Sequence, residues 1–379
     1  MTGGLLRVAR NDIKNYSIIK QLNVIQLIDS LQAGGAEMMA VNIANGLAEL
    51  GVVSHIGVTR KEGDLKEKIA PNVSYVFLNK KYTLDIVALK KLIAYVKKHQ
   101  INLIHAHSSS YFMAYLVTLF CPNVRLIWHD HYGNSEQVSN RSIFPLKLIS
   151  RRFKAILSVN KKLADWARLN LKAPQVTYLS NFAVLTKTSN DIIFLKGIIG
   201  KRIVCLANLR PQKDHLNLLE AFIKIKQCHP NWSLHLVGMD FKNTYASQIN
   251  SFIVANDLNN HVFLYGSIKN VAEVLQQAAI GVLASNSEGL PVALLEYGLA
   301  KLPVVVTNVG ECSSVVKHQQ CGLVVPAENS NELANALQFL IENAHKRDAW
   351  GVALQQRIQQ NYSQEVYMNK LVEIYKDES

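Results

Sequence analysis

Two glutamates, Glu288 and Glu296, stand eight residues apart on either side of a Gly-Leu-Pro turn. The apolar run before them, 280–285, predicts a buried strand, and the run 291–300 predicts a helix with Pro291 at its first position. A helix start carries free backbone N–H groups and the positive end of the helix dipole, which together suit a phosphate. Carboxylates on both sides of it can accept hydrogen bonds from sugar hydroxyls. The segment therefore predicts a nucleotide-sugar site, with solvated glutamates as the simpler alternative.

Two cations stand just before the start of another predicted helix, in the segment 208–215. They are Arg210 and Lys213. The planar fork of an arginine and the point charge of a lysine both stabilise negative charge that builds up on a departing diphosphate. The alternative is a surface ion pair with the neighbouring Asp214, which is a common and weak interaction. Gly238, at the end of the next predicted strand, is expected to line the same nucleotide pocket.

Histidines gather at the ends of two strands predicted for the first half of the chain. With the aspartate between two of them, they are His105, His107, His129, Asp130 and His131. His105 and His107 share one face of an extended chain, because side chains alternate along a strand. The group suits a metal site, a general acid or base, or a polar rim for sugar hydroxyls, and single histidines at strand ends are often only hydrogen-bonded. Because no Cys or Glu clusters with them to complete a ligand set, the sequence predicts no metal.

A glycine pair, Gly34-Gly35, follows the first predicted strand and leads into a helix. It allows close approach of the backbone to a phosphate, or forms only a tight turn. It is not the G-x-G-x-x-G fingerprint, and no acidic residue ends the next strand, so a nicotinamide cofactor is not expected.

The composition indicates a folded chain without a membrane span. Of its 379 residues 49% are hydrophobic and 18% are charged, which allows two or three α/β domains with ample core. The five cysteines are scattered and form no Cys-x-x-Cys pair, so a reducing cytoplasm is expected rather than a disulfide framework. The best apolar run, 111–121, is too short to cross a bilayer, and no hydrophobic signal core follows the basic N-terminus.

The net charge of +13 is confined to the first half of the chain. Residues 1–190 hold 25 Lys and Arg against 11 Asp and Glu, whereas residues 191–379 hold 16 against 17. Basic groups occur at 80–81, 90–91, 97–98 and 151–154. They suit an anionic membrane surface or a phosphate-bearing acceptor, with solvated helix faces as the alternative. No recognition helix or aromatic stacking motif accompanies them, so nucleic acid is not expected as a partner.

Strand-like and helical segments alternate through both halves of the chain. In the first half, strands are expected at 24–28, 53–58, 75–78, 103–105, 126–128 and 155–159, and helices at 36–50 and 83–99. In the second half, strands are expected at 203–206, 233–237, 262–264, 281–284 and 304–307, and helices at 215–229, 271–278 and 291–300. This alternation predicts the α/β class, with two doubly wound Rossmann-like domains. Ligands of such sheets bind beyond the carboxyl ends of the strands, where the residues named above fall.

The domains are expected over 1–185 and 186–362, with a hinge in the polar stretch 181–190. A final helical segment within 363–379 is expected to pack back on the first domain.

Four features, in this order, resemble the large family 4 of retaining GT-B glycosyltransferases, also called glycosyl transferases group 1. They are the Gly34-Gly35-Ala36-Glu37 turn, the His105-Ala106-His107 strand end, the Arg210 and Lys213 pair, and the Glu288 and Glu296 spacing. The resemblance covers nearly the whole chain and is most specific over 203–326. It implies a GT-B fold, in which an acceptor-binding N-terminal domain and a nucleotide-sugar-binding C-terminal domain face each other across a cleft. One departure is the segment 207–210, Ala-Asn-Leu-Arg, where many members have a glycine-rich Gly-Arg-Leu segment.

The resemblance also implies roles for single residues on the donor side. Glu288 would contact hydroxyls of the donor sugar, and Glu296 would contact the ribose hydroxyls. Arg210 and Lys213 would hold the diphosphate and carry the rate. The further donor-binding positions are Gly34, Gly35, Gly238, Leu290 and Pro291.

The implied reaction is transfer of a sugar from a nucleotide-diphosphate donor to a saccharide or lipid-linked saccharide acceptor, with retention and with no cofactor or metal. His107 would line the reaction site. The segment His129-Asp130-His131 is similar to that of members acting in bacterial surface polysaccharide assembly and would line the acceptor side. With the basic first half, this implies a cytoplasmic enzyme, peripheral on the inner face of the cytoplasmic membrane.

Two other classes fit a two-domain nucleotide-sugar fold. A nucleotide-sugar epimerase would turn over the donor without any acceptor. A non-catalytic sugar-nucleotide-binding protein would keep the cleft and tolerate loss of Arg210 and Lys213.

Overall fold

The computed structural model describes residues 21–32, 34–132, 138, 141–185 and 193–376. These residues form two compact units. The first unit holds the described residues of Met1–His131, Asn140–Leu179 and Gln364–Ser379, and the second holds those of Tyr132–Ser139 and Ser180–Ser363. The predicted hinge at 181–190 and the predicted boundary after 185 fall partly or wholly on residues outside the described ranges.

The first unit is built on a sheet of seven parallel strands in the order β3-β2-β1-β4-β5-β6-β7. In chain order the strands are β1 (Asn23–Ser30), β2 (Val53–Lys61), β3 (Ser74–Phe77), β4 (Leu103–His107), β5 (Arg125–Asp130), β6 (Ala155–Ser158) and β7 (Gln175–Tyr178). The inner strands are rich in Val, Ile and Leu and are buried on both faces, as helix-covered parallel strands are.

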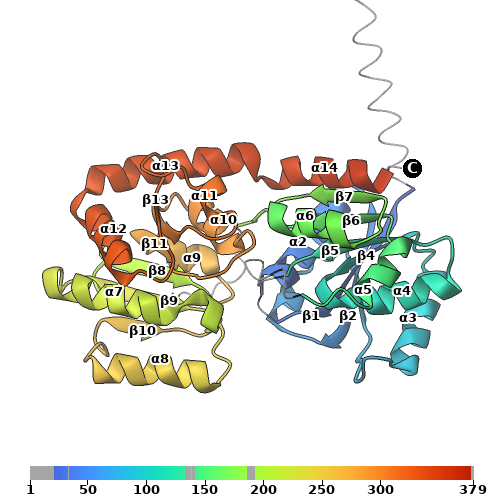
Figure 1. Ribbon diagram of the computed structural model, residues 1–379, viewed down its shortest axis with the longest axis horizontal. Coiled ribbons are helices and arrows are strands. Elements are labelled where there is room, and N and C mark those ends of the chain that lie inside the picture. Colours follow the sequence, from blue (N-terminus) through green and yellow to red (C-terminus); the bar gives the residue numbers. More distant parts are fainter. Residues whose placement is uncertain (1–20, 33, 133–137, 139–140, 186–192, 377–379) are drawn as a thin grey trace, which may run out of the picture. The chain divides into compact units, whose positions relative to one another are not determined.

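Helices connect these strands (Figure 1). They are α2 (Gly35–Glu49), α3 (Ile86–Lys98), α4 (Tyr111–Phe120), α5 (Leu146–Ile149) and α6 (Lys161–Asn170), with short 3₁₀ turns η1 (Asp64–Lys68), η2 (Ser108–Ser110) and η4 (Ser150–Arg152). The last helix of the chain, α14 (Gln364–Lys376), packs against α2 in this unit. Its Gln364 donates to Glu49 over 2.6 Å, and Arg125 donates to the Tyr375 carbonyl over 2.7 Å.

The second unit is built on a sheet of six parallel strands in the order β10-β9-β8-β11-β12-β13. The strands are β8 (Arg202–Leu206), β9 (Ser233–Val237), β10 (Val262–Leu264), β11 (Ile280–Leu283), β12 (Val304–Thr307) and β13 (Leu323–Val325). The helices are α7 (His215–Cys228), α8 (Thr244–Ala255), α9 (Val271–Gln276), α10 (Val292–Leu299), α11 (Cys312–Val315), α12 (Ser330–Glu342) and α13 (Ala344–Asn361), with a 3₁₀ turn η5 (Pro211–Lys213).

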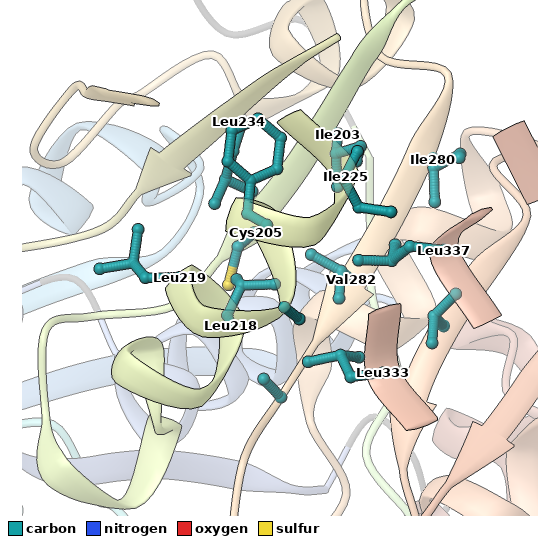
Figure 2. Packing of buried hydrophobic residues seen from close by; sticks show 14 of the residues in the cluster. Ile203, Cys205, Leu218, Leu219, Ile225, Leu234, Ile280, Val282, Leu333 and Leu337 are labelled. Carbon is teal, nitrogen blue, oxygen red and sulfur yellow. The ribbon is translucent and has the colours of Figure 1, made fainter. Parts of the chain in front are cut away.

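A large apolar cluster in the second unit lies between its sheet and helices that include α7 and α12. Leucine and isoleucine side chains of α7 and α12 meet those of β8, β9 and β11 (Figure 2). Leu218, Leu333 and Val282 are among the fully buried members. This burial fixes the strands from which the loops of the site extend.

The α/β class and the doubly wound arrangement predicted from the sequence are confirmed by both sheets. The prediction missed two edge strands, β7 and β13, which have only four and three residues. It also placed Pro291 inside α10, whereas Pro291 is extended at the N-cap, with ψ of 123°, and the helix begins at Val292. None of the described helices is both long and apolar enough to cross a bilayer.

Tyr297 of α10 ties this helix to the two central strands of the second sheet. Its hydroxyl accepts a hydrogen bond from the Leu206 N–H over 2.7 Å and lies 3.2 Å from the carbonyl oxygens of Val204 and Val282. The ring is fully buried and lies over Gly281, where a Cβ would come within 2.8 Å of it. The hydroxyl thus satisfies backbone groups that have no access to water.

We expect Tyr297→Phe to lower the free energy of unfolding by about 1–3 kcal/mol, because the Leu206 N–H loses its buried acceptor. Urea unfolding at neutral pH measures this. The matched control is Tyr82→Phe at a side chain that is 71% exposed, which should leave the unfolding free energy unchanged. Equal stability of the two variants would contradict this role of Tyr297.

Candidate active site

An ion pair joins two of the predicted site residues at the carboxyl edge of the second sheet. Lys213, at the end of η5, places its Nζ 2.5 Å from Oε1 of Glu288. The Glu288 side chain is 7% exposed and that of Lys213 is 22% exposed. Lys213 follows β8 and Glu288 follows β11, and these strands are neighbours in the sheet. The sequence analysis named both residues but not their contact.

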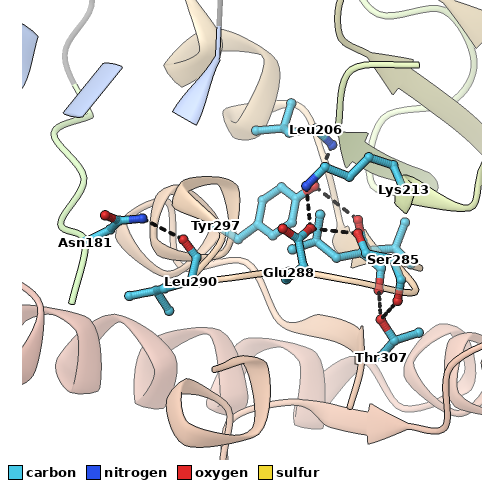
Figure 3. A network of polar contacts seen from close by, with 10 residues as sticks. Asn181, Leu206, Lys213, Ser285, Glu288, Leu290, Tyr297 and Thr307 are labelled. Carbon is cyan, nitrogen blue, oxygen red and sulfur yellow. Dashed lines mark hydrogen bonds and ion pairs between the residues drawn. The ribbon is translucent and has the colours of Figure 1, made fainter. Parts of the chain in front are cut away.

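Two further residues hold the Glu288 carboxylate in place. Ser285 donates its hydroxyl to the same Oε1 over 2.7 Å. The Ser285 carbonyl in turn accepts a hydrogen bond of 2.5 Å from Thr307, at the end of β12 (Figure 3). The network therefore links the carboxyl ends of β8, β11 and β12. Glu288 is oriented before any ligand arrives.

Backbone contacts join the loops that carry these residues. The Asn286 N–H donates to the Gln212 carbonyl over 3.0 Å, which ties the Glu288 loop to η5. The Glu311 N–H donates to the Gly289 carbonyl over 2.9 Å. Gly310 has φ of +52°, and a Cβ there would collide with the carbonyl oxygens of Glu288 and Gly289. Only glycine fits this turn without strain.

Arg210 lies beside this network but does not belong to it. The residue is exposed, and its guanidinium stacks 4.9 Å from the ring centre of Phe241. Asp214, the predicted alternative partner of the two cations, instead caps α7 by accepting from the Asn217 N–H over 3.4 Å. An ion pair with Asp214 is therefore not what holds Lys213. Arg210 keeps its charge at the surface.

The turn before α10 is fixed by a residue that the sequence analysis did not single out. Asn181 is buried and donates to the Leu290 carbonyl over 2.8 Å (Figure 3). The Pro291 carbonyl accepts from the Leu294 N–H over 3.1 Å, and proline has no N–H to offer. A backbone donor to a phosphate at this turn must therefore come from Leu290 or from the first turn of α10. Glu296, further along the helix, is half-buried.

Gly238, at the end of β9, lies against the end of the neighbouring strand β8. A Cβ at this position would collide with the backbone of Ala207 and Asn208. The Asn208 side chain also accepts from the Met239 N–H over 2.8 Å. Gly238 therefore has a packing role in this structure, and its predicted contact with the nucleotide stays a prediction.

In the first unit, the predicted glycine turn lies at the start of α2. Gly34 is the extended N-cap residue and Gly35 is the first residue of the helix. The Glu37 carboxylate lies directly against Gly34, where a Cβ would clash with it. A carboxylate is stable at a helix N-terminus because of the helix dipole. A phosphate at Gly34 and Gly35 would have to displace it.

The four predicted histidines come together at the carboxyl ends of β4 and β5. His105 and His107 stack with ring centres 4.5 Å apart, and His129 lies 5.2 Å from His105. His131 stacks on His107 at 5.2 Å. Side chains of His105, His107 and His129 are fully buried. The strand β4 extends to His107, two residues beyond the predicted end, which places both of its histidines on one face of the sheet.

Hydrogen bonds assign the proton positions in this histidine stack. Nε2 of His107 lies 2.8 Å from Oε1 of Gln26, a carbonyl-type oxygen that only accepts, so this nitrogen carries the proton. Nδ1 of neutral His107 is then an acceptor, and Nε2 of His131, 3.0 Å away, donates to it. Tyr375 of α14 lies 2.6 Å from Nδ1 of His105 and 3.3 Å from Nε2 of Gln26. Its hydroxyl therefore accepts from Gln26 and donates to His105.

A metal held by the stack would have to break a hydrogen bond of His107. Ring nitrogens of His105, His107 and His129 lie within 4.8 Å of one another, which meets the first condition for a site. Both nitrogens of His107 are already hydrogen-bonded, however, and the rings of His105 and His129 are within 13° of parallel. Parallel stacked rings do not aim their lone pairs at one point, as metal ligands must. The arrangement therefore favours a hydrogen-bonded stack of neutral histidines.

Asp130 and His129, which were predicted to line the acceptor side, are buried in this structure. Asp130 is 1% exposed and pairs with Arg141 over 2.5 Å. Arg141 also stacks on the rings of Trp128 and Trp166 at 5.3 and 4.7 Å. The aspartate is therefore held by a half-buried arginine, and His131 is the more accessible member of the segment. Contact of the segment with an acceptor stays a prediction.

Burial keeps the histidine stack uncharged near neutral pH. It lowers the pKa of His105 to about 3, with a smaller contribution from His131, and it lowers the pKa of His131 to about 3. The pKa values of His107 and His129 are also well below the usual range, chiefly because of burial. Neither ring nitrogen of His129 has a hydrogen-bond partner among the described residues. Four adjacent imidazoles avoid mutual repulsion only in this neutral state.

Comparison with known proteins identifies the family of this chain. Residues 33–185 match the family model for Glycosyltransferase Family 4, and residues 199–357 match the model for Glycosyl transferases group 1. The chain therefore belongs to family 4 of the glycosyltransferases, and its two sheets form the GT-B fold. The family, the fold and the transferase activity predicted from the sequence are confirmed.

Its relatives are distant in sequence. It is 24% identical over 324 residues to an uncharacterised glycosyltransferase of Haemophilus influenzae, covering 82% of this chain and 88% of that one. It is 22% identical to the UDP-Gal:α-D-GlcNAc-diphosphoundecaprenol α-1,3-galactosyltransferase of Escherichia coli, covering 74% of this chain and 78% of that one. The crystal structure of Anabaena Alr3699/HepE in complex with UDP and glucose superposes with a TM-score of 0.78 at 19% identity, covering 94% of this chain and all of that one.

The sequence analysis missed the residues that orient the predicted ones. In the second unit these are Ser285, Thr307 and Asn181, and in the first unit Gln26, Tyr375 and Arg141. Gln26 had a visible signal, since it is the one polar side chain in the apolar run 24–28. Tyr375 had none, because nothing in the sequence places the last helix next to β4.

The lowered histidine pKa values predict acid lability. An unfolded histidine titrates near pH 6.5, so the stability from keeping His105 neutral is complete above that pH and falls as the pH drops toward 3. Between pH 7 and pH 5 we expect the free energy of unfolding to fall by about 2 kcal/mol because of His105. The variant His105→Asn should not show this decrease. Urea unfolding at both pH values measures it. His345→Asn, at an exposed histidine, should keep the wild-type pH dependence. An unchanged pH dependence in His105→Asn would contradict the buried neutral stack.

Proposed function

We propose that this enzyme transfers a sugar, with retention of anomeric configuration, from a nucleotide-diphosphate donor to a saccharide or lipid-linked saccharide acceptor. We also propose that it acts in the cytoplasm, peripheral on the inner face of the membrane, and that it needs no metal. The observation that carries the donor part is the ion pair of Lys213 with the buried Glu288. The pair holds a cation next to a carboxylate. A sugar diphosphate needs both, the cation for its phosphates and the carboxylate for its sugar hydroxyls.

The pair gives each residue a role in donor binding. A buried charge without a partner is costly, so before a donor binds Lys213 and Glu288 neutralise each other. An arriving diphosphate offers Lys213 a second anion, which the exposed Arg210 and the first turn of α10 also attract. Glu288 stays fixed by Ser285 and can then accept a hydrogen bond from a sugar hydroxyl. Donor binding therefore exchanges one ionic contact for several.

The same groups suit the bond-breaking step. When the bond from the anomeric carbon to the diphosphate oxygen breaks, negative charge grows on the leaving diphosphate, next to Lys213 and Arg210. The acceptor oxygen attacks from the same face, and its proton passes to the leaving phosphate. Because the protein supplies fixed charges rather than a nucleophile, the rate depends on electrostatic stabilisation.

The histidine stack would supply polar but uncharged groups on the acceptor side. Neutral His107 is held in one tautomer by Gln26 and His131. A neutral imidazole does not repel a developing positive charge on the sugar as an imidazolium would. We assign His107 to the reaction site on this basis.

The relatives support the classes of donor and acceptor. HepE binds UDP and glucose, and the Escherichia coli relative uses a UDP-sugar and an acceptor on a diphosphate lipid. A Rhizobium leguminosarum relative is a mannosyltransferase of lipopolysaccharide core biosynthesis. A membrane-bound, phosphate-bearing acceptor also agrees with the excess of Lys and Arg in residues 1–190.

Purified protein should release nucleoside diphosphate from one nucleotide sugar of a panel, in an acceptor-dependent manner. Glu288→Ala should lower the transfer rate about tenfold or more while the protein stays folded, because the donor sugar loses its fixed acceptor. The matched control is Glu220→Ala, at an exposed glutamate of α7. Wild-type transfer rates in Glu288→Ala with normal donor affinity would contradict the assigned role.

The products separate this function from the alternatives. NMR of the product should show the anomeric configuration of the donor. Conversion of the donor to its epimer without an acceptor would indicate an epimerase instead. Donor binding without any turnover, unaffected by Arg210→Ala and Lys213→Ala, would indicate a binding protein.

Metal chelation tests the proposed independence from metal. We expect enzyme stripped of metal and assayed in EDTA to transfer at the untreated rate to within about twofold. The reason is that Lys213, Arg210 and the start of α10 already provide the positive charge. A rate that collapses in EDTA and returns only on addition of Mg²⁺ or Mn²⁺ would overturn this part of the proposal.

A further inference from the structure

A cavity lies at the opposite edge of the first sheet from the histidine stack. It has a volume of about 280 Å³ and is lined by ten residues, namely Thr118, Pro122, Val124, Arg125, Leu126, Arg151, Arg152, Phe153, Lys154 and Pro174. Arg125 begins β5, Lys154 immediately precedes β6 and Pro174 immediately precedes β7. The cavity therefore lies where parallel strands start, whereas the histidines lie where they end. We call it the basic cavity.

The lining is strongly cationic. Four of the ten residues are Arg or Lys, and no acidic residue lines the cavity. Arg151 and Arg152 form the exposed 3₁₀ turn η4, so their guanidinium groups are within reach of a ligand from solvent. Arg125 is anchored by its hydrogen bond to the Tyr375 carbonyl. Guanidinium forks bind phosphate oxygens in pairs, so the chemistry of the cavity suits a phosphate.

Exposed apolar side chains border the basic cavity. Leu119 and Phe120, between the lining residues Thr118 and Pro122, are 49% and 58% exposed. Leu148, in the helix that leads directly into η4, is 59% exposed. Large apolar groups beside arginines are the combination by which proteins bind the membrane interface, the apolar groups entering the acyl boundary and the cations meeting the headgroups.

We propose that the basic cavity and its apolar border, Leu119, Phe120 and Leu148, form a docking surface for an anionic lipid bilayer, with a lipid phosphate held by Arg151 and Arg152. This inference rests on the proposed function, in which the acceptor is presented on a membrane. The docking surface would assign a specific role to some of the excess Lys and Arg residues in the first half of the chain. Because it lies at the strand starts, it is separate from the histidine stack.

Vesicle binding tests the proposal. Full-length protein is sedimented with vesicles of phosphatidylcholine alone or of phosphatidylcholine mixed with phosphatidylglycerol. We expect binding only to the anionic vesicles, and a loss of about tenfold or more in the double variant Arg151→Gln/Arg152→Gln. The charge-matched control is Lys90→Gln/Lys91→Gln, which removes two exposed cations from α3 and should reduce binding far less. Arg151→Lys/Arg152→Lys should give an intermediate result, and Phe120→Ser should weaken binding at unchanged charge.

Several outcomes would overturn the proposal. Equal losses of vesicle binding in Arg151→Gln/Arg152→Gln and in Lys90→Gln/Lys91→Gln would mean that only the overall charge of the protein matters. Full vesicle binding by Arg151→Gln/Arg152→Gln, with an unchanged melting temperature, would exclude the cavity. Stabilisation by inorganic phosphate that depends on these arginines, without vesicle binding, would make it a site for a soluble anion.

The test is separable from that of the proposed function. Transfer to a water-soluble acceptor should be the same in wild type and Arg151→Gln/Arg152→Gln, since neither arginine belongs to the donor site. If vesicle binding fails while transfer persists, only the docking surface is wrong. If no nucleotide sugar is used while vesicles are bound through the cavity, the proposed reaction is wrong.

Discussion

The ion pair between Lys213 and Glu288 is the interaction on which the site of the second unit depends. A carboxylate that is only 7% exposed is costly to bury without a cation and hydrogen-bond donors. Lys213 and Ser285 both donate to the same oxygen of Glu288, and Thr307 holds the Ser285 backbone. The pair therefore keeps acid and base in position and leaves both able to take a new partner. A sugar diphosphate carries both partners, an anion for the lysine and hydroxyls for the glutamate.

The parallel sheet makes this arrangement possible. Lys213, Glu288 and Thr307 are far apart in sequence, but they follow or end three adjacent strands that all run in the same direction. In the first unit, too, the carboxyl ends of adjacent parallel strands lie at one edge of the sheet. There the ends of β4 and β5 bring four histidines together. Burial removes their charge, the Tyr375 hydroxyl donates to His105, and Gln26 accepts a hydrogen bond from His107. The edge of the second sheet thus holds fixed charge, and the edge of the first holds buried neutral polar groups.

Much of this could be predicted from the sequence. Alternating apolar runs identified eleven of the thirteen strands in the described part of the chain, because Val, Ile and Leu dominate buried parallel strands. The edge strand β7, Gln-Val-Thr-Tyr, lacked that signal, whereas β13, Leu-Val-Val, carried it over three residues only and was missed. The candidate site residues could be named because charged and polar types follow apolar runs. Their pairing was not, since a sequence does not say whether Lys213 turns to Asp214 next to it or to Glu288 on the neighbouring strand. The burial of Asp130 and the place of Tyr375 likewise depend on contacts across the fold.

The most direct measurement is a crystal structure of the protein with a bound nucleoside diphosphate, UDP or GDP. The quantity of interest is the distance from Lys213 Nζ to the nearest diphosphate oxygen. The account predicts a hydrogen-bond distance, with Glu288 still held by Ser285. A diphosphate bound away from Lys213, with the Lys213 and Glu288 pair unchanged, would contradict it.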